Sequence, residues 1–119
     1  MRHEPTRDRG SASAELAVAL PTLMLVIGFG MGAVSAVAAQ LRCVDAAREA
    51  ARAAARAEPA GTVRELAAET GPAGSQAEIR STGDRVVVTV HAPVHLLGGM
   101  LPDVTVWGQA VGLREPGVP

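Results

Sequence analysis

The feature that most constrains this chain is an apolar stretch of 24 residues, from Leu16 to Ala39, without a charged side chain. As an α-helix it would be about 36 Å long, more than the roughly 30 Å hydrocarbon core of a bilayer. A soluble helix of this length without charged residues would be unusual in a chain of 119 residues. The stretch therefore predicts one membrane-inserted helix over residues 11–39, and Pro21 near its start predicts a bend.

Small residues recur at every fourth position in this stretch, at Gly28, Gly32 and Ala36. Residues with this spacing share one face of a helix, and in lipid such a strip lets another helix approach closely. Because glycine and alanine are abundant in the chain, chance spacing is an equal alternative. The strip predicts helix packing without identifying the partner.

An ordinary secretory signal peptide is one interpretation of the N-terminus. Arg7 and Arg9 would form its basic region, and a cut after Ala38, in Ala36-Val37-Ala38, would release a small secreted binding domain. The apolar stretch is longer than the usual 7–15 residues or so of a signal peptide. Glu15 also directly precedes it, which disfavours this interpretation. A bitopic membrane protein that never enters a fibre is another alternative.

The residues around Glu15 favour a third interpretation. The segment "G-SASAE" places Glu15 five residues after Gly10, between a short charged segment and the apolar stretch. This spacing resembles the type IV prepilin processing site. The longer pattern through Ala17 and Pro21, with "DAAREAARAAA" at residues 45–55, resembles the TadE-like minor pilins of tight-adherence (Flp) pili. The resemblance covers residues 10 to about 56.

The resemblance implies a prepilin-type leader over residues 1–10, which a prepilin peptidase would cut between Gly10 and Ser11. It also implies that Glu15 pairs with the free amine of Ser11 on a neighbouring subunit and so sets the register between subunits. Two opposite charges near lipid offset part of each other's desolvation cost. The alternative is a glutamate that merely lies at the membrane interface. The implied partners are the membrane, other pilin or pseudopilin subunits and the Tad assembly machinery.

The helix is expected to continue beyond the membrane as an amphipathic extension and to end at Pro59. Its apolar side is predicted to carry Leu41, Val44, Ala47 and Ala51, and its polar side Arg48, Arg52 and Arg56. Asp45 and Glu49 precede two of these arginines by three residues, a spacing that favours ion pairs. With these acids present and no stacking aromatic residues, the arginines predict a solvated face rather than a nucleic-acid contact.

The remaining sequence predicts a second, short helix and a small sheet. Thr62 and Glu65 have the spacing of a capping box, with a helix to about Glu69. Alternating apolar residues predict strands over residues 77–81 and 85–92, with Val86, Val88 and Val90 on one face. Pro93 is expected to end the second strand, residues 95–103 to form an apolar loop, and a third strand to start at Val104. The fold class is thus α+β and reduced pilin-like, with residues 40–119 as the exported part.

Other single residues carry weaker signals. Cys43 is interpreted as a small apolar helix residue rather than half of an intermolecular disulfide. His91 and His95 would lie roughly 13 Å apart along a strand, so a shared metal ion is not expected. Trp107 is either half-exposed or the main core residue of a thin domain. No motif indicates a catalytic site or a cofactor, and we expect no enzyme.

These observations together predict a single-pass protein of the cytoplasmic membrane with residues 40–119 outside the cytoplasm, and a place in an extracellular pilus. The expected role is that of a minor pilin or pseudopilin in pilus assembly, adherence or related secretion. The flanking arginines do not decide the orientation, because a long exported segment can translocate regardless of such charges. The sequence leaves open whether the subunit is major or minor.

Overall fold

The computed structural model describes residues 5–114, with side chains from residue 9 onward. Residues 1–4 of the expected leader lie outside the described residues. The predicted α+β fold, a long helix followed by a short helix and a three-stranded antiparallel sheet, is confirmed. The elements are α1 (Pro5–Ala55), α2 (Ala60–Thr70), β1 (Gln76–Thr82), β2 (Arg85–Val94), η1 (Leu96–Gly99) and β3 (Val104–Leu113).

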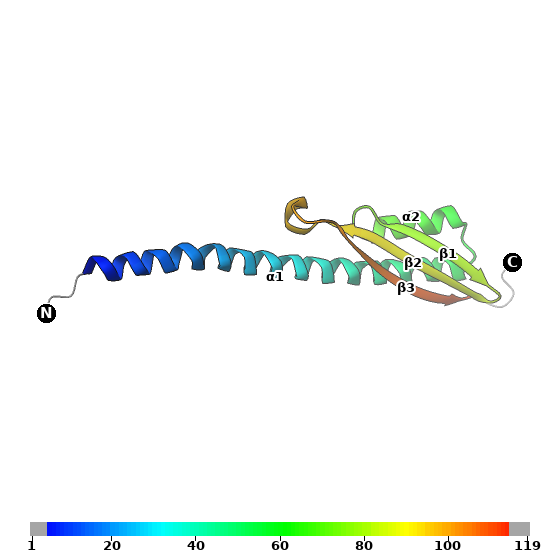
Figure 1. The fold of residues 1–119 in the computed structure, drawn as a ribbon. Coiled ribbons are helices and arrows are strands. Elements are labelled where there is room, and N and C mark those ends of the chain that lie inside the picture. Colours follow the sequence, from blue (N-terminus) through cyan, green and yellow to red (C-terminus); the bar gives the residue numbers. More distant parts are fainter. Residues whose placement is uncertain (1–4, 115–119) are drawn as a thin grey trace.

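The long helix α1 is the axis of the molecule, and α2 and the sheet lie against its C-terminal part (Figure 1). Its N-terminal part projects from this domain, so the molecule measures 94 × 21 × 18 Å. We call residues 9–42 of α1 the stem, because none of them is buried and Cys43 is the first buried residue. The stem and the domain are therefore held together by one continuous helix.

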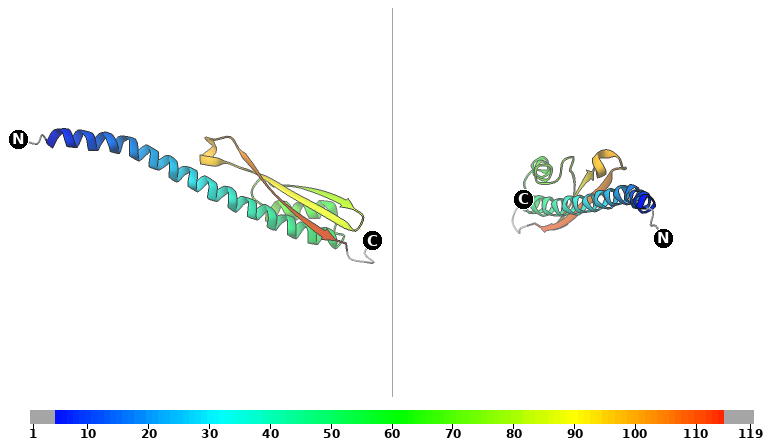
Figure 2. Two further views of the ribbon diagram at one scale, coloured as in Figure 1. Left: turned by 60° about the horizontal axis from the view of Figure 1, so that its bottom comes forward. Right: turned by 90° about the vertical axis from the view of Figure 1, so that its left-hand side faces the viewer.

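Pro21 does not interrupt α1, which is continuous on both sides of it and curves gently along its length (Figure 2). Proline cannot donate the hydrogen bond that a helical residue normally gives to the carbonyl four positions earlier. In the next position, the Thr22 hydroxyl donates a hydrogen bond of 2.8 Å to the carbonyl of Val18. The expected bend is thus a gentle curve rather than a sharp kink.

The C-terminal end of α1 comes earlier than predicted: the helix ends at Ala55, and Pro59 is not its stop signal. Ala57 adopts a left-handed conformation with φ of 59°. Its N–H donates to the carbonyl of Ala54 at 3.0 Å, and the N–H of Glu58 donates to the carbonyl of Ala53 at 3.2 Å. This pair of bonds is a Schellman motif, which satisfies carbonyls that a helix end leaves free.

Helix α2 begins at Ala60, directly after Pro59, and no side chain caps its N-terminus. The predicted capping box is therefore wrong, because Thr62 already lies within the helix. Pro59 is the N-cap residue, with φ of −56° and ψ of 143°. Val63 and Ala67 are buried, and they attach α2 to the domain.

The sheet has the strand order β1-β2-β3, and both pairs are antiparallel. A two-residue turn, Gly83 and Asp84, joins β1 to β2, since Thr82 pairs with Arg85. Gly83 has φ of 60°, a conformation that glycine adopts without steric cost. Val86, Val88 and Val90 are buried, so the predicted inward face of β2 is confirmed.

The prediction that Pro93 ends β2 is wrong. Pro93 lies within β2 and pairs with Thr105 of β3. The pairing of β2 with β1 stops two residues before Pro93, where Gln76, the first residue of β1, lies opposite His91. Pro93 is therefore paired on one side only. Proline is tolerated at such an edge position because no neighbouring strand needs its missing N–H.

The core lies between the C-terminal part of α1 and one face of the sheet, and it is thin. We call the buried residues of α1 the alanine face: Cys43, Ala46, Ala47, Ala50, Ala51, Ala53 and Ala54. Opposite them lie the inward valines of β2 and Val106 of β3. Trp107 is 56% exposed, so the half-exposed interpretation is confirmed and the main-core interpretation is wrong.

Two glycines allow β3 to lie directly on the backbone of α1. A methyl group on Gly108 would lie 2.6 Å from the carbonyl carbon of Cys43 and still closer to Val44, and one on Gly112 would lie 2.6 Å from the carbonyl oxygen of Ala51. Real side chains do not approach a backbone so closely. Only glycine therefore permits this distance between helix and strand.

Candidate assembly surface on the long helix

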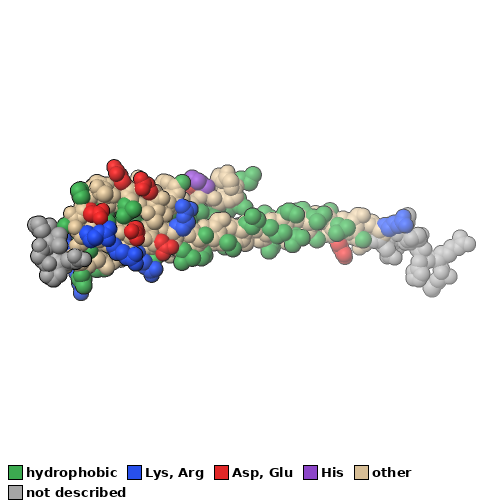
Figure 3. All heavy atoms as spheres, turned by 180° about the vertical axis from the view of Figure 1, so that it is seen from behind, with side chains coloured by type: hydrophobic (Ala, Val, Ile, Leu, Met, Phe, Trp, Pro, Cys, Tyr) green, Lys and Arg blue, Asp and Glu red, His purple; other side chains and the backbone are tan. Residues whose placement is uncertain are grey.

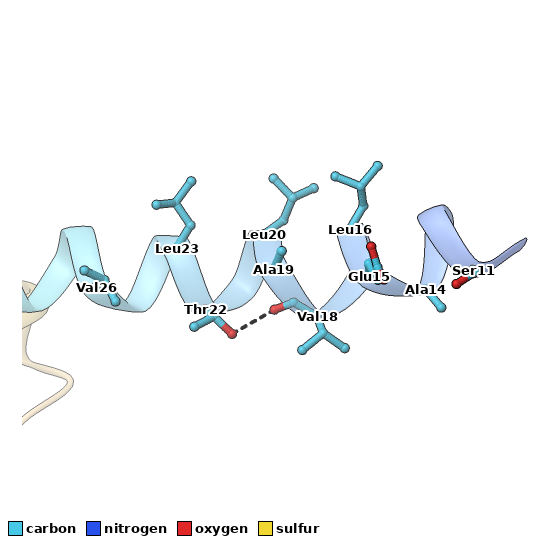
Figure 4. Close-up of a pocket in the computed structure, with 10 residues that line it drawn as sticks. All are labelled: Ser11, Ala14, Glu15, Leu16, Val18, Ala19, Leu20, Thr22, Leu23 and Val26. Atoms are coloured by element: carbon cyan, nitrogen blue, oxygen red, sulfur yellow. Dashed lines mark hydrogen bonds between the residues drawn. The ribbon is translucent and has the colours of Figure 1, made fainter. Parts of the chain in front are cut away.

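Ser11 and Glu15 lie four residues apart on α1 and share one face with Val18 and Thr22 (Figure 4). Gly10 precedes them in the same helix, and nothing lies within 4 Å of the position a methyl group would take there. Ser11 and Glu15 are exposed. The three residues of the predicted processing site are thus accessible on one bare helix.

Glu15 has no partner within its own chain as far as the structure describes it. Within residues 9–114, its carboxylate forms no ion pair and no hydrogen bond. The hollow beside it is open and formed by α1 alone, with Ala14, Ala19 and Leu23 among its apolar lining residues. A carboxylate in such surroundings gains from a cationic partner that another molecule supplies.

The stem exposes an apolar surface over most of its length. Its large apolar side chains from Leu16 to Leu41 are between 45% and 70% exposed. In the space-filling view the charged side chains gather over the domain, whereas the stem is mainly hydrophobic (Figure 3). By length and composition, α1 fits a single membrane crossing, and no residue of its most apolar window is buried.

The strip of small residues faces a loop of the same chain. A methyl group on Gly28 would lie 3.0 Å from the Leu97 side chain, and one on Gly32 would lie 3.5 Å from the Leu96 side chain. Ala36 lines the same hollow as these residues. The apolar loop between β2 and β3 therefore lies along the strip. That this strip also packs against another helix stays a prediction, as do the roles of Gly10, Ser11, Glu15 and Pro21.

The strip and the alanine face are one continuous surface of α1. At 100° per residue, Gly32 and Ala36 point in the same direction as Cys43 and Ala50 farther along the helix. The domain thus lies over one side of α1 from Gly28 to Ala54. Sequence spacing indicated the strip, but its neighbour within the chain, the apolar loop, lies more than sixty residues away from Gly28 and Gly32 in the sequence.

Leu41 lies outside this surface, and its predicted place on the apolar side is wrong. It is 60% exposed, whereas Ala47 and Ala51 of the same prediction are buried. The two expected ion pairs are confirmed, with 3.8 Å between Arg48 and Asp45 and 3.5 Å between Arg52 and Glu49. Since Asp45 and both arginines are largely exposed and Glu49 is about half-exposed, each pair contributes only a few tenths of a kcal/mol.

Cys43 is fully buried on the alanine face, and its interpretation as a small apolar helix residue is confirmed. Its sulfur lies 4.0 Å from the carbonyl oxygen of Val106. Burial raises the pKa of the Cys43 thiol, and the nearby Arg42 guanidinium offsets part of this rise. The protonated thiol is therefore favoured in the folded chain, and a disulfide with a second subunit would require the domain to open.

The histidines do not share a site. His95 Nδ1 lies 2.7 Å from an Asp103 carboxylate oxygen, and both side chains are exposed. His91 lies within β2 opposite Trp107 of β3. Among the described residues, no group of three or more histidine, cysteine, aspartate or glutamate side chains is placed to hold a metal ion.

Comparison with known proteins identifies relatives that share the long N-terminal segment of this chain. Residues 10–52 match the family model of the TadE-like proteins. The chain is also 40% identical over 106 residues to a protein of Mycobacterium tuberculosis named "Apoptosis inhibitor Rv3655c". That alignment covers 87% of this chain and 78% of the relative. No solved structure matches the chain significantly.

Proposed function

The chain belongs to the TadE-like family, and on that premise we propose that it is a minor pilin or pseudopilin of a tight-adherence pilus. It acts in pilus assembly, in adherence or in a related secretion process. The observation that carries this proposal is the stem, a long exposed apolar helix with one carboxylate, Glu15, at its N-terminal end. Such a helix serves as a membrane anchor and as a contact between subunits.

The stem needs an apolar environment other than its own domain. Full burial of a side chain such as leucine, valine or phenylalanine contributes about 1.5–3 kcal/mol relative to its exposure in water. The stem exposes many of these side chains over a length that matches a bilayer. We therefore place it in the cytoplasmic membrane before assembly and against the helices of other subunits afterwards.

Glu15 gives this anchor a specific contact. Cleavage by a prepilin peptidase between Gly10 and Ser11 would leave a free amine on Ser11, four residues from Glu15 on the same helix face. The amine of one subunit then reaches the Glu15 carboxylate of its neighbour. Because each charge alone is costly near lipid, the pair favours one axial position between adjacent helices.

We further propose an orientation for this arrangement. The processing site lies at the cytoplasmic edge of the membrane, and residues 40–119 lie outside the cytoplasm. The domain at the far end of α1 then contacts other pilus components. Its exposed surface carries Trp107, an aromatic side chain of the kind enriched in protein interfaces.

The secreted-domain alternative conflicts with how the loop packs. A cut after Ala38 would remove Gly28 and Gly32, the surface that Leu96 and Leu97 contact. Both leucines would then be exposed on a small domain whose core is already thin. The bitopic alternative keeps the stem but gives Glu15 no partner.

The proposal is tested by replacing Glu15 with alanine in the native host and crosslinking the subunit to other pilus proteins. We expect Glu15→Ala to enter the membrane as well as the unaltered chain, since it removes a charge next to lipid. Its crosslinking to other subunits should fall several-fold. Glu69→Ala, at an exposed glutamate of α2, is the matched control and should crosslink normally. Equal crosslinking of both variants would contradict the proposed role.

A further inference from the structure

The loop between β2 and β3 is apolar, and its tip is exposed. Residues 96–102 read LLGGMLP and contain no charged side chain. Met100, at the tip of this loop, is 87% exposed. An apolar side chain this exposed contributes nothing to the domain's own stability, so the loop is suited to contact another apolar medium.

The contacts of the loop with α1 fix its position along the stem. A hydrocarbon core of about 30 Å that starts at Leu16 ends near residue 36. Gly32 then lies about 6 Å and Gly28 about 12 Å inside the outer boundary. Leu96 lies against the first of these glycines and Leu97 against the second. If α1 crosses the membrane, the loop is therefore at the depth of the outer leaflet.

The polar residues that flank the loop lie at the boundary itself. Val104, where β3 starts, lines the same hollow as Ala36 and Gln40 of α1. The contact between His95 Nδ1 and an Asp103 carboxylate oxygen, at 2.7 Å, lies at the base of the loop beside this level. The carboxylate of Asp103 therefore lies where the hydrocarbon core would begin, and residues 96–102 beyond it carry no charged side chain.

We propose that residues 96–101 insert into the outer leaflet of the bilayer beside α1, as a second, short membrane contact of the exported domain. This inference rests on the membrane crossing in the proposed function. The ligand is the acyl-chain region of the same bilayer. The contact would hold the domain down against the membrane surface and limit its rotation about α1.

The backbone of the loop is the main cost of such an insertion, because lipid cannot satisfy free N–H and C=O groups. Two features reduce this cost. The glycines of the strip let the loop lie close against α1, which shields it from lipid on that side. The N–H of Met100 also donates to the carbonyl of Leu97 at 3.2 Å, which closes a turn at the tip.

Fluorescence quenching by lipids tests the proposal. Single cysteines would be placed at Met100 in the loop, Phe29 in the stem and Asp84 at the opposite end of the sheet, each in a Cys43→Ala chain. The full-length protein, with an environment-sensitive fluorophore on the cysteine, would be reconstituted in phosphatidylcholine–phosphatidylglycerol vesicles. Nitroxides on the acyl chains then quench labels in the hydrocarbon core, and iodide quenches labels in water.

We expect acyl-chain quenching at positions 29 and 100, several-fold stronger than at position 84, which iodide should quench instead. Iodide quenching at 100 with lipid quenching at 29 would overturn the loop insertion and leave the membrane crossing intact. A label at 100 protected from both quenchers would mean that protein covers the loop, which also overturns the proposal. No lipid quenching at 29 would refute the membrane crossing and the insertion with it.

Discussion

The stem and the C-terminal part of α1 differ in burial, and the difference is the reverse of what hydropathy alone suggests. The stem carries the larger apolar side chains, such as Leu20, Ile27 and Phe29, and leaves them exposed. The C-terminal part is rich in alanine and arginine, and its alanines are buried under the sheet. Burial therefore follows the position of the sheet and the small size of the buried side chains. The stem is a surface built for a medium other than water.

Small side chains on the alanine face have a specific consequence for packing. Alanine buries little apolar area, but it lets β3 approach the backbone of α1 at Gly108 and Gly112. Helix and sheet are thus held by close contact over many small groups, each contributing little. A surface of this kind is sensitive to added volume, whereas the stem is not. The predictions below use this difference.

Gly108→Val should have the largest effect. Its side chain would meet the backbone of Cys43 and Val44, which cannot move aside like a side chain. We expect a loss of more than about 3 kcal/mol, at the upper end of overpacking costs, and an unfolded domain. The fluorescence of Trp107, the single tryptophan, reports this in urea titrations in detergent. Gly61→Val, where the added group meets nothing within 4 Å, should leave the transition close to that of the unaltered chain.

A matched pair of alanine substitutions compares the two parts of α1 directly. Ala50→Leu adds volume to the buried alanine face and should destabilise the domain by about 1–3 kcal/mol. Ala38→Leu makes the same change on the exposed stem and should stay within about 0.5 kcal/mol. The measurement is the urea midpoint of each variant in the same detergent. Equal losses would show that the stem packs against the domain more than the structure indicates.

Ala57→Gly should stabilise the domain, by about 1 kcal/mol. Ala57 has φ of 59°, where a side chain is strained and glycine is not. In the middle of a helix the same change has the opposite sign, so Ala68→Gly, at an exposed position of α2, should cost about 1 kcal/mol. Thermal unfolding of the two variants checks both signs. A lower melting temperature for Ala57→Gly would mean that the left-handed cap does not form.

Cys43→Ala should have the smallest effect on stability, and this effect should depend on pH. Because burial raises the pKa of the Cys43 thiol, the folded state holds this proton more tightly than the unfolded state. The contribution of the protonated Cys43 thiol to the free energy of unfolding is complete below the ordinary thiol pKa of about 8.5. It falls as the pH rises through the higher pKa of the folded state. As the pH rises above about 8.5, the free energy of unfolding of the unaltered chain should therefore fall relative to that of Cys43→Ala. A difference that does not change with pH would contradict a buried thiol.

Much of this fold follows from the sequence because its signals are local. The uncharged stretch, the alternation of Val86, Val88 and Val90, and the three-residue spacing of acids and arginines each depend on neighbours in the chain. Two predictions were wrong for different reasons. A local contact decides at Thr62, which cannot cap α2 because the helix already begins at Ala60. A distant one decides at Pro93, which remains in a strand because β2 pairs with β1 only as far as His91.

The candidate surface was predictable only in part for the same reason. Spacing identified Gly28, Gly32 and Ala36 as a strip for close packing. No local pattern connects that strip to Leu96 and Leu97, which reach it only after the sheet has formed. Glu15 is conspicuous in the sequence because a charge next to an apolar stretch is costly, whatever its partner.

The mass of the mature protein from its native host tests the central claim most directly, namely that the stem stays attached as anchor and subunit contact. We predict a chain that lacks residues 1–10 and begins at Ser11, with the whole apolar stretch retained. Gly10→Leu should block the cut and leave a longer chain that inserts but does not assemble. A mature chain that begins near Ala39 would contradict the account, because the domain would then be secreted without its stem.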